Sequence, residues 1–414
     1  MKIKLTIWLL LVLVMVMILD SCNPDLTPPT IPIDEKKVLQ GTKSLTSEAD
    51  VLSEGVYRIK PGGDEFGPLA VIKKTGDQFS VFFGKSISYA ILYAGEKKGT
   101  VYFEGYWRFA QNSNTGSMSL TIDPTAGASD VLSGKKPSVL ILTGTYKLYG
   151  VDKKISLEYQ RPIHIDTNYY IISHRGGGRN IDRLPASENS VEMIKYSERL
   201  GVNGIEIDVQ LTKDSIPVIF HDEYMNKRLI NEDYFIGKVS DYTYAQLRAF
   251  VTLKNGEKIP TLEEALKAAM DNNAIKLVWL DSKYPSVVRK IAPIQKKFLD
   301  QAKSKNRNIR VLIGIPDEDI LNAYLKIDNH KNYPALCELD SSLFVKSTAE
   351  VWAPRWSLGL QPDMVKSVHD QSKQAFVWTL DVPDFIHTFI KDGKFDGILT
   401  NYPTQVAYEF YAKE

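Results

Sequence analysis

Short apolar runs alternate with helical patterns over the C-terminal part of the chain, residues 165–414. Each run has the length and composition of a buried strand. The eight runs lie at 170–173, 204–209, 276–281, 310–315, 335–339, 350–354, 375–380 and 397–400. Between them lie helical segments such as 190–200, which Gly201 would end. Another begins near Thr261, with Glu264 at capping-box spacing. Strands separated by helices in this way predict an α/β fold, a (β/α)8 TIM barrel, with functional residues at the C-terminal ends of the strands.

Residues 38–160 follow a different pattern, in which short strand-like segments are separated by glycine-containing turns. The clearest segments are 78–84, 100–110 and 137–148. Many short strands at this spacing predict an all-β domain, either an antiparallel barrel or a sandwich. Its aromatic residues favour a packed core over a ligand pocket, and they include Tyr102, Phe103, Tyr106, Trp107 and Phe109. No metal, nucleophile or phosphate motif occurs in this region, so the pattern assigns it no role and leaves open a ligand of unknown chemistry.

The first 22 residues have the pattern of a secretion signal. Two lysines precede an apolar run over 5–19, which is short for a membrane span and suits a signal sequence. Leu19-Asp20-Ser21-Cys22 then resembles a bacterial lipobox. We therefore expect Cys22 to be lipidated and to anchor the protein to a bacterial membrane in the cell envelope. An uncleaved single-span anchor is the alternative. The proline-rich residues 23–37 predict an extended tether.

Charge and cysteine content narrow the range of partners. Lys plus Arg (51) nearly equals Asp plus Glu (50), so no excess of positive charge points to nucleic acid. The two cysteines are Cys22 and Cys337. Acylation of the first would leave no pair for a disulfide, and we expect the second to be a small buried apolar residue.

Histidines and carboxylates gather where the predicted strands end. The strand 170–173 is followed at once by His174, Arg175 and three glycines. In the next strand Glu206 and Asp208 alternate with apolar residues, so both carboxylates lie on one face. Burying two unpaired carboxylates is costly, and a divalent cation such as Mg²⁺ or Ca²⁺ would offset the repulsion. An ordinary strand with one wet, acidic face is the alternative.

Two further strand ends extend this pattern. The run 276–281 ends in Asp281, and Lys283 lies on the same face of the strand. A third carboxylate would complete a metal site, and the lysine would add a fixed positive charge for an anionic substrate. His221 ends another apolar run, and together with His174 it forms a candidate acid–base pair.

Taken in order, these motifs resemble those of the glycerophosphodiester phosphodiesterase family, within the wider group of phospholipase C-like phosphodiesterases. The matching segments are His174-Arg175-Gly176, Glu188-Asn189-Ser190, Glu206-Ile207-Asp208, His221-Asp222, Pro260-Thr261-Leu262-Glu263-Glu264, Asp281-Ser282-Lys283, Val377-Trp378-Thr379 and Asp396-Gly397-Ile398-Leu399-Thr400-Asn401. Their ordered combination is specific, although no single motif is decisive. The resemblance covers the predicted TIM barrel.

The chain departs from the family pattern in two places. Pro185 precedes Glu188 by three residues, whereas the family usually has a proline directly before its Glu-Asn pair. The family usually has glutamate where this chain has Asp281. Sphingomyelinase D-type relatives carry an aspartate followed by lysine at that place, so cleavage of a phospholipid or sphingolipid headgroup is an alternative function.

The resemblance implies metal-dependent hydrolysis of glycerophosphodiesters to glycerol 3-phosphate and an alcohol. A neighbouring substrate hydroxyl would attack first, and water would then open the cyclic phosphate. The expected metal ligands are Glu206, Asp208 and Asp281; the expected catalytic residues are His174, His221, Arg175 and Lys283; the expected substrate contacts are Glu188, Asn189 and Trp378. Which histidine is the acid and which the base stays open, and Trp378 is equally consistent with a buried aromatic residue.

Two functions of another kind remain as alternatives. The chain could be a surface binding lipoprotein with an inactive barrel, or a structural protein of the envelope. Neither would need two histidines, three carboxylates, an arginine and a lysine at the ends of successive strands. This combination therefore favours an enzyme.

Overall fold

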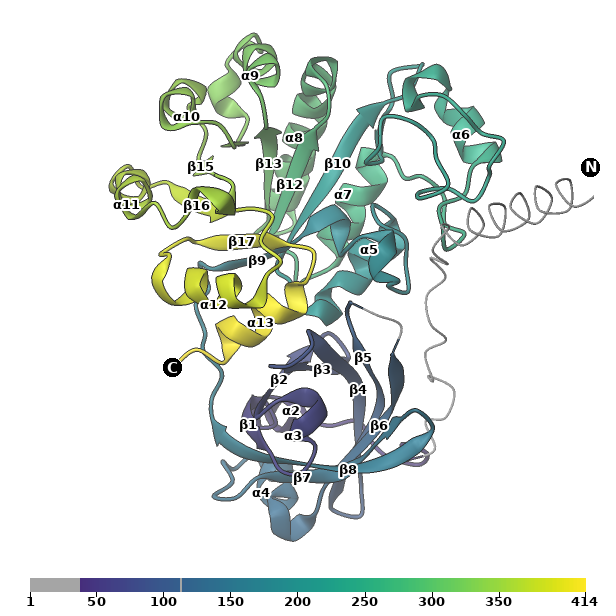
Figure 1. The fold of residues 1–414 in the computed structure, drawn as a ribbon, viewed down its shortest axis with the longest axis vertical. Helices are drawn as coiled ribbons and strands as arrows, with labels where there is room; N and C mark the ends of the chain where they lie inside the picture. Colours follow the sequence, from purple (N-terminus) through teal and green to yellow (C-terminus); the bar gives the residue numbers. More distant parts are fainter. Residues whose placement is uncertain (1–37, 112–113) are drawn as a thin grey trace, which may run out of the picture.

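The computed structural model describes residues 38–111 and 114–414, which form two barrels joined by a short connection (Figure 1). The predicted signal sequence, the lipidated Cys22 and the tether at 23–37 lie outside the described residues. In the described part of the chain, no helix is both long and apolar enough to span a bilayer. Membrane anchoring therefore stays a prediction.

Within the described residues, the N-terminal barrel consists of eight antiparallel strands. Each strand pairs with its neighbour in sequence, and β1 pairs with β8 to close the barrel. The strands are β1 (Gly55–Ile59), β2 (Leu69–Thr75), β3 (Gln78–Phe83), β4 (Ser88–Lys97), β5 (Thr100–Phe109), β6 (Thr115–Ile122), β7 (Ile141–Leu148) and β8 (Val151–Arg161). Three short helices accompany them, α2 (Ser47–Leu52), α3 (Gly63–Phe66) and α4 (Ala128–Leu132). Of the two predicted all-β architectures, the structure has the barrel.

Aromatic side chains fill the interior of this barrel. Phe103 and Trp107 of β5 are buried in its core, and the rings of Trp107 and Phe66 lie 5.5 Å apart at an angle of 79°. Tyr106 lies on the outer face and packs against the second barrel, because successive residues of a strand face opposite sides. The predicted core role is therefore confirmed for Phe103 and Trp107. A ligand of this domain stays a prediction.

Within the described residues, the second barrel has eight parallel strands, as the sequence predicts. They are β9 (Tyr170–Ser173), β10 (Gly204–Leu211), β12 (Leu277–Ser282), β13 (Arg310–Ile315), β14 (Ala335–Cys337), β15 (Val351–Trp352), β16 (Gln374–Val377) and β17 (Gly397–Thr400). β17 pairs with β9, and β9 pairs with β10, so the barrel is closed. β14, β15 and β16 are shorter than predicted, and β16 ends at Val377 where the prediction continues to residue 380.

One strand lies outside this parallel set. β11 (Pro217–Ile219) pairs antiparallel with the end of β10, with Val209 opposite Ile219. His221 therefore follows a strand that runs back along β10 and is not a member of the closed barrel. The hairpin still returns His221 to the end of β10 that carries Asp208, because the amide of Phe220 donates to the carbonyl of Asp208 at 3.0 Å.

Helices surround the barrel (Figure 1). They are α5 (Val191–Tyr196), α6 (Tyr244–Phe250), α7 (Leu262–Asp271), α8 (Pro285–Ser304), α9 (Glu318–Leu325), α10 (Ser341–Ser347), α11 (Pro362–Asp370), α12 (Pro383–Asp392) and α13 (Pro403–Tyr411). The predicted capping box starts α7, since Thr261 and Glu264 each accept a hydrogen bond from the backbone amide of the other. The helix predicted at 190–200 is α5 followed by the 3₁₀ helix η4 (Ser197–Leu200), and Gly201 ends it with a left-handed backbone.

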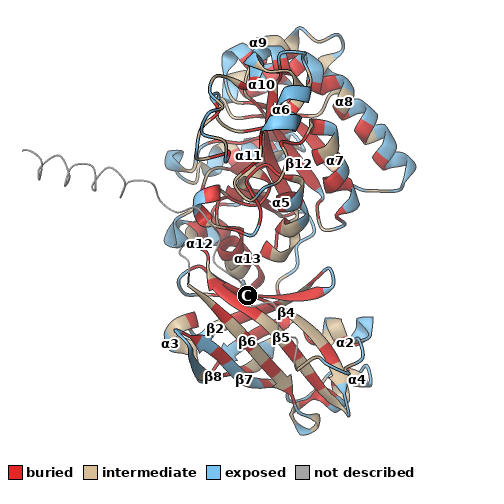
Figure 2. Cartoon of the chain, turned by 90° about the vertical axis from the view of Figure 1, so that its right-hand side faces the viewer, coloured by how far each residue is buried: buried red, intermediate tan, exposed pale blue. Residues whose placement is uncertain are grey.

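The outer face of the N-terminal barrel packs against the second barrel. Phe82 of β3 and Tyr89 of β4 are buried in the same cluster as Phe410 and Tyr411 of α13. The rings of Phe82 and Tyr411 are stacked with centroids 6.3 Å apart. Figure 2 shows the strip of buried residues on this face of the strands below α13. The two barrels therefore share a continuous apolar interface.

Candidate active site

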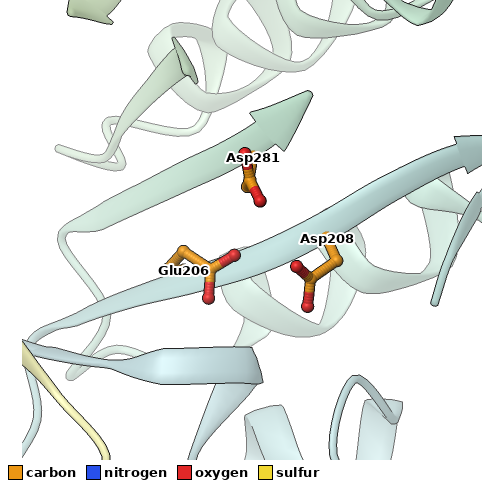
Figure 3. A group of neighbouring side chains, drawn as sticks. All are labelled: Glu206, Asp208 and Asp281. Atoms are coloured by element: carbon orange, nitrogen blue, oxygen red, sulfur yellow. The ribbon is translucent and has the colours of Figure 1, made fainter. Parts of the chain in front are cut away.

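Three carboxylates from two adjacent strands converge at the C-terminal end of the second barrel. Glu206 and Asp208 lie on β10, and Asp281 lies directly opposite Asp208 in the register of β12. One oxygen from each can be chosen so that all three lie within 4.8 Å of one another. Figure 3 shows the three side chains directed toward a common space. The predicted metal ligands are therefore brought together by strand pairing.

Burial makes this arrangement electrostatically costly. Glu206 is 2% exposed and Asp208 is fully buried. Burial raises the pKa of Glu206 well above its usual value, and the nearby carboxylates of Asp208 and Asp281 raise it further. Burial also raises the pKa of Asp281, with a contribution from Asp208. The three groups cannot all be ionised at neutral pH without nearby positive charge.

Lys283 supplies part of that charge. Its ammonium lies 2.6 Å from Oδ1 of Asp208 and 2.5 Å from Oδ2 of Asp281. Burial acts to lower the pKa of Lys283, but the neighbouring carboxylates, Asp208 first among them, outweigh it and raise the pKa. One ammonium ion balances the charge of one of the three carboxylates. With all three ionised, the cluster would keep a net negative charge that a cation could neutralise.

The donor set fits a divalent metal ion. Among the described residues, none donates a hydrogen bond to Oε1 of Glu206, although this atom is buried. A buried carboxylate oxygen without a partner is costly, and a bound cation would satisfy it. Carboxylate oxygens are also the ligands that Mg²⁺ and Ca²⁺ prefer. The cluster of Glu206, Asp208 and Asp281 can therefore hold such an ion.

A chain of hydrogen bonds fixes the tautomer of His174. Nδ2 of Asn401 donates to Oδ2 of Asp381 at 2.6 Å, so Oδ1 of Asn401 is the atom that faces His174. That oxygen lies 2.8 Å from Nδ1 of His174, which must therefore carry the proton. Nε2 of His174 is left as the acceptor and lies 3.7 Å from Oε2 of Glu206. The imidazole is thus oriented with its basic nitrogen toward the carboxylate cluster.

The surroundings keep His174 neutral. Burial lowers the pKa of His174 from 6.5 to about 4, and the positive charge of Arg175 contributes in the same direction. A neutral imidazole with a free Nε2 can accept a proton. This is the state required of a general base.

His221 has a different environment. Its Nδ1 lies 2.6 Å from Oδ1 of Asp222, and its Nε2 accepts a hydrogen bond from the guanidinium of Arg175 at 2.8 Å. Burial acts to raise the pKa of Asp222, but hydrogen bonds from His221, Arg228 and Asn226 outweigh it and hold the pKa below its usual value. Asp222 is therefore an anion that can stabilise a protonated His221. The rings of the two histidines, His174 and His221, are 6.5 Å apart.

Arg175 links the carboxylate cluster to His221. Its backbone is left-handed, with φ 55°, and its amide donates to Oε2 of Glu206 at 2.8 Å. One terminal nitrogen of its guanidinium donates to Glu188 at 2.8 Å and the other to His221. A left-handed backbone at a residue other than glycine costs energy, so the surrounding contacts must hold it.

Glu188 and Asn189, predicted to contact the substrate, contact Arg175 and Asp208 in this structure. Glu188 is 2% exposed, and its carboxylate accepts hydrogen bonds from Arg175 and Arg228 at 2.8 and 3.0 Å. Asn189 donates to Oδ2 of Asp208 at 2.6 Å. In this structure the two side chains position Arg175 and Asp208.

Trp378 lies at the end of β16, at the mouth of the barrel. It is partly buried and packs against the apolar layer that fills the barrel interior. Its indole nitrogen donates to the carbonyl of Ala353 at 2.8 Å, and the guanidinium of Arg355 lies 4.7 Å from the ring centroid. The ring is therefore held in place at the rim of the site, and contact with substrate stays a prediction.

The sequence analysis missed two residues that hold this arrangement, Asn180 and Asp381, and it missed the contacts of a third, Arg228, with Glu188 and Asp222. Asp381 lies just beyond the predicted strand 375–380, so its place at a strand end was a usable signal. Asn180 and Arg228 lie in irregular segments, where no periodic pattern indicates a neighbour. Their roles become visible only when the loops are folded against each other.

The C-terminal end of the TIM barrel brings together two histidines, three carboxylates and two basic residues, a set that suits the hydrolysis of a phosphoric diester. Residues 174–405 match the family model of the glycerophosphoryl diester phosphodiesterase family. This match covers more than half of the chain, and the chain belongs to that family.

Individual proteins are similar to the same region. A glycerophosphodiester phosphodiesterase from Caldanaerobacter subterraneus subsp. tengcongensis is 28% identical over 245 residues, which are 56% of this chain and 94% of that protein. Glycerophosphodiester phosphodiesterase 1 from Homo sapiens is 32% identical over 110 residues, 25% of this chain and 30% of that protein. A crystal structure of a glycerophosphodiester phosphodiesterase from Parabacteroides distasonis covers 58% of this chain and 98% of its own, with 24% identity and a TM-score of 0.46.

Proposed function

We propose that this protein hydrolyses glycerophosphodiesters to glycerol 3-phosphate and an alcohol, in a reaction that depends on a divalent cation. The observation that carries the proposal is the convergence of two histidines with the carboxylate cluster. The rings of His174 and His221 lie 6.5 Å apart, Nε2 of His174 faces Glu206, and Arg175 contacts both Glu206 and His221. Family membership supports the same reaction class.

Glu206, Asp208 and Asp281 would hold the cation, which we propose to be Mg²⁺ or Ca²⁺. When bound, it would supply positive charge to a non-bridging oxygen of the phosphate. The unpartnered Oε1 of Glu206 supports this assignment. Lys283 would favour the ionised forms of Asp208 and Asp281, which are the forms that can act as ligands, before the cation arrives.

His174 is the proposed general base in the first step. Its Nε2 takes the proton from a glycerol hydroxyl as that oxygen attacks the neighbouring phosphorus. The hydrogen bond from Nδ1 to Asn401 supports this role, because it leaves Nε2 as the acceptor. Bases positioned in this way contribute roughly 10²–10⁴-fold to rate.

His221 is the proposed general acid. In this role the guanidinium of Arg175 turns from Nε2 of His221 to the phosphate, and Nε2 carries a proton. His221 donates that proton to the leaving alcohol oxygen as the bond between that oxygen and phosphorus breaks. The ion pair between Asp222 and Nδ1 supports this role, because it stabilises the protonated imidazole. In the second step the roles reverse: water attacks the cyclic phosphate, His221 takes its proton, and His174 returns a proton to the glycerol oxygen.

Arg175 and Lys283 are the proposed stabilisers of the charge that develops on phosphate. The guanidinium of Arg175 is planar and can make two parallel hydrogen bonds to phosphate oxygens. Its position between Glu188 and His221 supports the assignment, because the side chain is already held beside the acid. Preorganised donors of this kind need no reorganisation when the reaction occurs.

The proposed cellular location follows from the sequence alone. We propose that Cys22 is lipidated and anchors the chain to a bacterial envelope membrane, because residues 19–22 resemble a lipobox. Mass spectrometry of the N-terminal peptide from the native host tests this. A diacylated Cys22 at the N-terminus is the expected result, and an unmodified residue 22 inside a longer peptide would contradict it.

A substrate panel tests the reaction class. Purified protein is incubated with glycerophosphocholine, glycerophosphoethanolamine and glycerophosphoglycerol, and in parallel with phosphatidylcholine and sphingomyelin vesicles, in the presence of Mg²⁺ and Ca²⁺. Release of glycerol 3-phosphate from the soluble diesters is the expected result. Turnover of the vesicles alone would reject the proposed substrate class.

A further inference from the structure

Among the polar contacts that the described residues make between the two barrels, one joins Arg108 to the loop that carries Arg175. Arg108 of β5 is fully buried, and its side chain lies on the outer face of the strand, as that of Tyr106 does. Its guanidinium donates to the carbonyl of Asp182 at 2.9 Å and to the carbonyl of Arg183 at 2.8 Å. Both acceptors belong to the loop that follows β9 and carries the catalytic Arg175.

The loop needs such support because its backbone is strained. Arg175, Arg183 and Asn189 all have left-handed backbones, with φ values of 55°, 52° and 58°. Such conformations cost about 1–3 kcal/mol each outside glycine and persist only where the surroundings hold them. Arg108 binds the carbonyl that precedes Arg183, which is that of Asp182, and the carbonyl of Arg183 itself, and so contacts the backbone directly at one of these three residues.

Hydrogen bonds continue from this turn to the catalytic groups. Asn180, in the same turn, donates its backbone amide to Oε2 of Glu188 at 2.8 Å and accepts the amide of Glu188 at 2.9 Å. Glu188 in turn binds Arg175 at 2.8 Å, and Arg175 binds His221 at 2.8 Å. The path from the N-terminal barrel to the acid–base pair is therefore unbroken.

We infer that Arg108 is a positioning residue, through which the N-terminal barrel orders the loop 179–190 and holds Arg175 in its working orientation. The inference rests on the proposed function, since it takes Arg175 and His221 as catalytic. It also gives the N-terminal barrel a role within the reaction. The Caldanaerobacter relative aligns over 94% of its length with only 56% of this chain, so it has no room for an equivalent barrel of this size.

The test compares Arg108→Met with Tyr106→Phe in the purified protein. Arg108→Met removes the guanidinium, and with it both hydrogen bonds to the loop, and keeps most of the side-chain volume. Tyr106→Phe is the matched control, because it removes a hydrogen bond of 2.8 Å to Tyr196 at the same interface and on the same strand. Two readouts are taken from each: kcat and KM for glycerol 3-phosphate release, and hydrogen–deuterium exchange of peptides covering 179–190.

Arg108→Met is expected to lower kcat roughly 10- to 100-fold, with KM changed by less than about threefold, because misplacing a group that acts in the transition state costs turnover and not binding. Exchange over 179–190 is expected to rise at least about tenfold. Tyr106→Phe is expected to match the wild type in both. Arg108→Lys, which keeps one donor, serves if the methionine variant does not fold, and is expected to recover part of both losses.

Unchanged exchange over 179–190 in Arg108→Met would overturn the inference whatever the substrate is, because this measurement needs no turnover. Unchanged kcat beside faster exchange would also overturn it, since the loop would then not position Arg175. Wild-type protein that is inactive on every glycerophosphodiester would instead reject the proposed function. The two failures are therefore distinguishable.

Discussion

Nδ1 of His174 donates a hydrogen bond of 2.8 Å to Oδ1 of Asn401, a residue at the end of the last strand of the barrel. Asp381 holds the amide of Asn401 in the orientation that makes this possible, because a carboxylate can only accept the hydrogen bonds from its nitrogen atoms. The tautomer of the proposed base is thus set by two residues that never need to touch the substrate.

Replacing Asp381 by asparagine should therefore impair the base without touching it. The new amide can donate to Asn401, which allows Asn401 to flip and lets either nitrogen of His174 carry the proton. We expect kcat to fall by roughly 10²-fold. Asp384→Asn, an exposed change three residues further on in α12, is the control and should leave kcat unaltered. Equal rates for the two variants would contradict the tautomer argument.

The carboxylate cluster predicts that Glu206 does not stabilise the metal-free protein and is needed to bind the cation. Burial and the neighbouring carboxylates raise the pKa of Glu206, so its charged form is unfavourable in the metal-free protein. Glu206→Gln removes this ionisable group, and the metal-free variant should be at least as stable as the metal-free wild type. Binding of Mg²⁺ or Ca²⁺ to the folded state should raise the melting temperature of the wild type and leave that of the variant unchanged. Thermal unfolding with and without cation measures both effects. A similar cation-induced shift in both proteins would place the ion elsewhere.

The assignment of His221 as the acid predicts a dependence on the leaving group. His221→Ala should lose roughly 10²–10⁴-fold in activity on alkyl diesters such as glycerophosphocholine, whose leaving oxygen needs a proton. Nitrophenyl esters have good leaving groups and should lose far less. The measurement is the rate on each substrate class in wild type and variant, from which the loss on alkyl diesters is compared with the loss on nitrophenyl esters. Equal losses on the two classes would assign His221 another role.

The lowered pKa of His174 predicts how stability depends on pH. The pKa of His174 is about 4 in the folded protein and 6.5 when the side chain is free in the unfolded chain. Between these two pH values the unfolded chain therefore binds more protons than the folded protein. Stability therefore falls as the pH drops from 6.5 toward 4, and the contribution of His174 is about 2 kcal/mol between about pH 7 and about pH 5.

Denaturant unfolding of wild type and His174→Asn at these two pH values, in metal-free buffer, measures that contribution. Asparagine places an amide nitrogen near the position of Nδ1, so it keeps a donor for Asn401. The variant is expected to lose less stability than the wild type on acidification. An identical loss in both proteins would show that His174 titrates normally.

The arrangement of the second barrel could be predicted because it repeats a local pattern. Each strand is a short apolar run, and the period-two alternation of residues 205–209 places Glu206 and Asp208 on one face before any tertiary contact is known. The pairing of Asp208 with Asp281 then follows from the order of the strands in a TIM barrel. Periodicity and topology were sufficient for this part of the site.

The supporting contacts could not be predicted, because they join segments that no local pattern connects. Arg108 lies on a strand whose alternation indicates only that it points outward, and its acceptors are backbone carbonyls of an irregular loop. Glu188 was expected to contact the substrate because Glu188-Asn189-Ser190 resembles a motif of the family, and that contact stays a prediction. Its burial against Arg175 and Arg228 depends on how the loop folds over the barrel. The antiparallel course of β11 likewise depends on a tight hairpin that the apolar run before His221 did not reveal.

The central claim is that a divalent cation at Glu206, Asp208 and Asp281 is required to hydrolyse a glycerophosphodiester. The most direct measurement follows glycerol 3-phosphate release by chelator-treated wild type and Glu206→Gln, as Mg²⁺ or Ca²⁺ is added back. The account predicts that chelation abolishes release, that one of the two cations restores it in the wild type, and that neither restores it in the variant. Full activity in the presence of chelator, or equal recovery in both proteins, would contradict it.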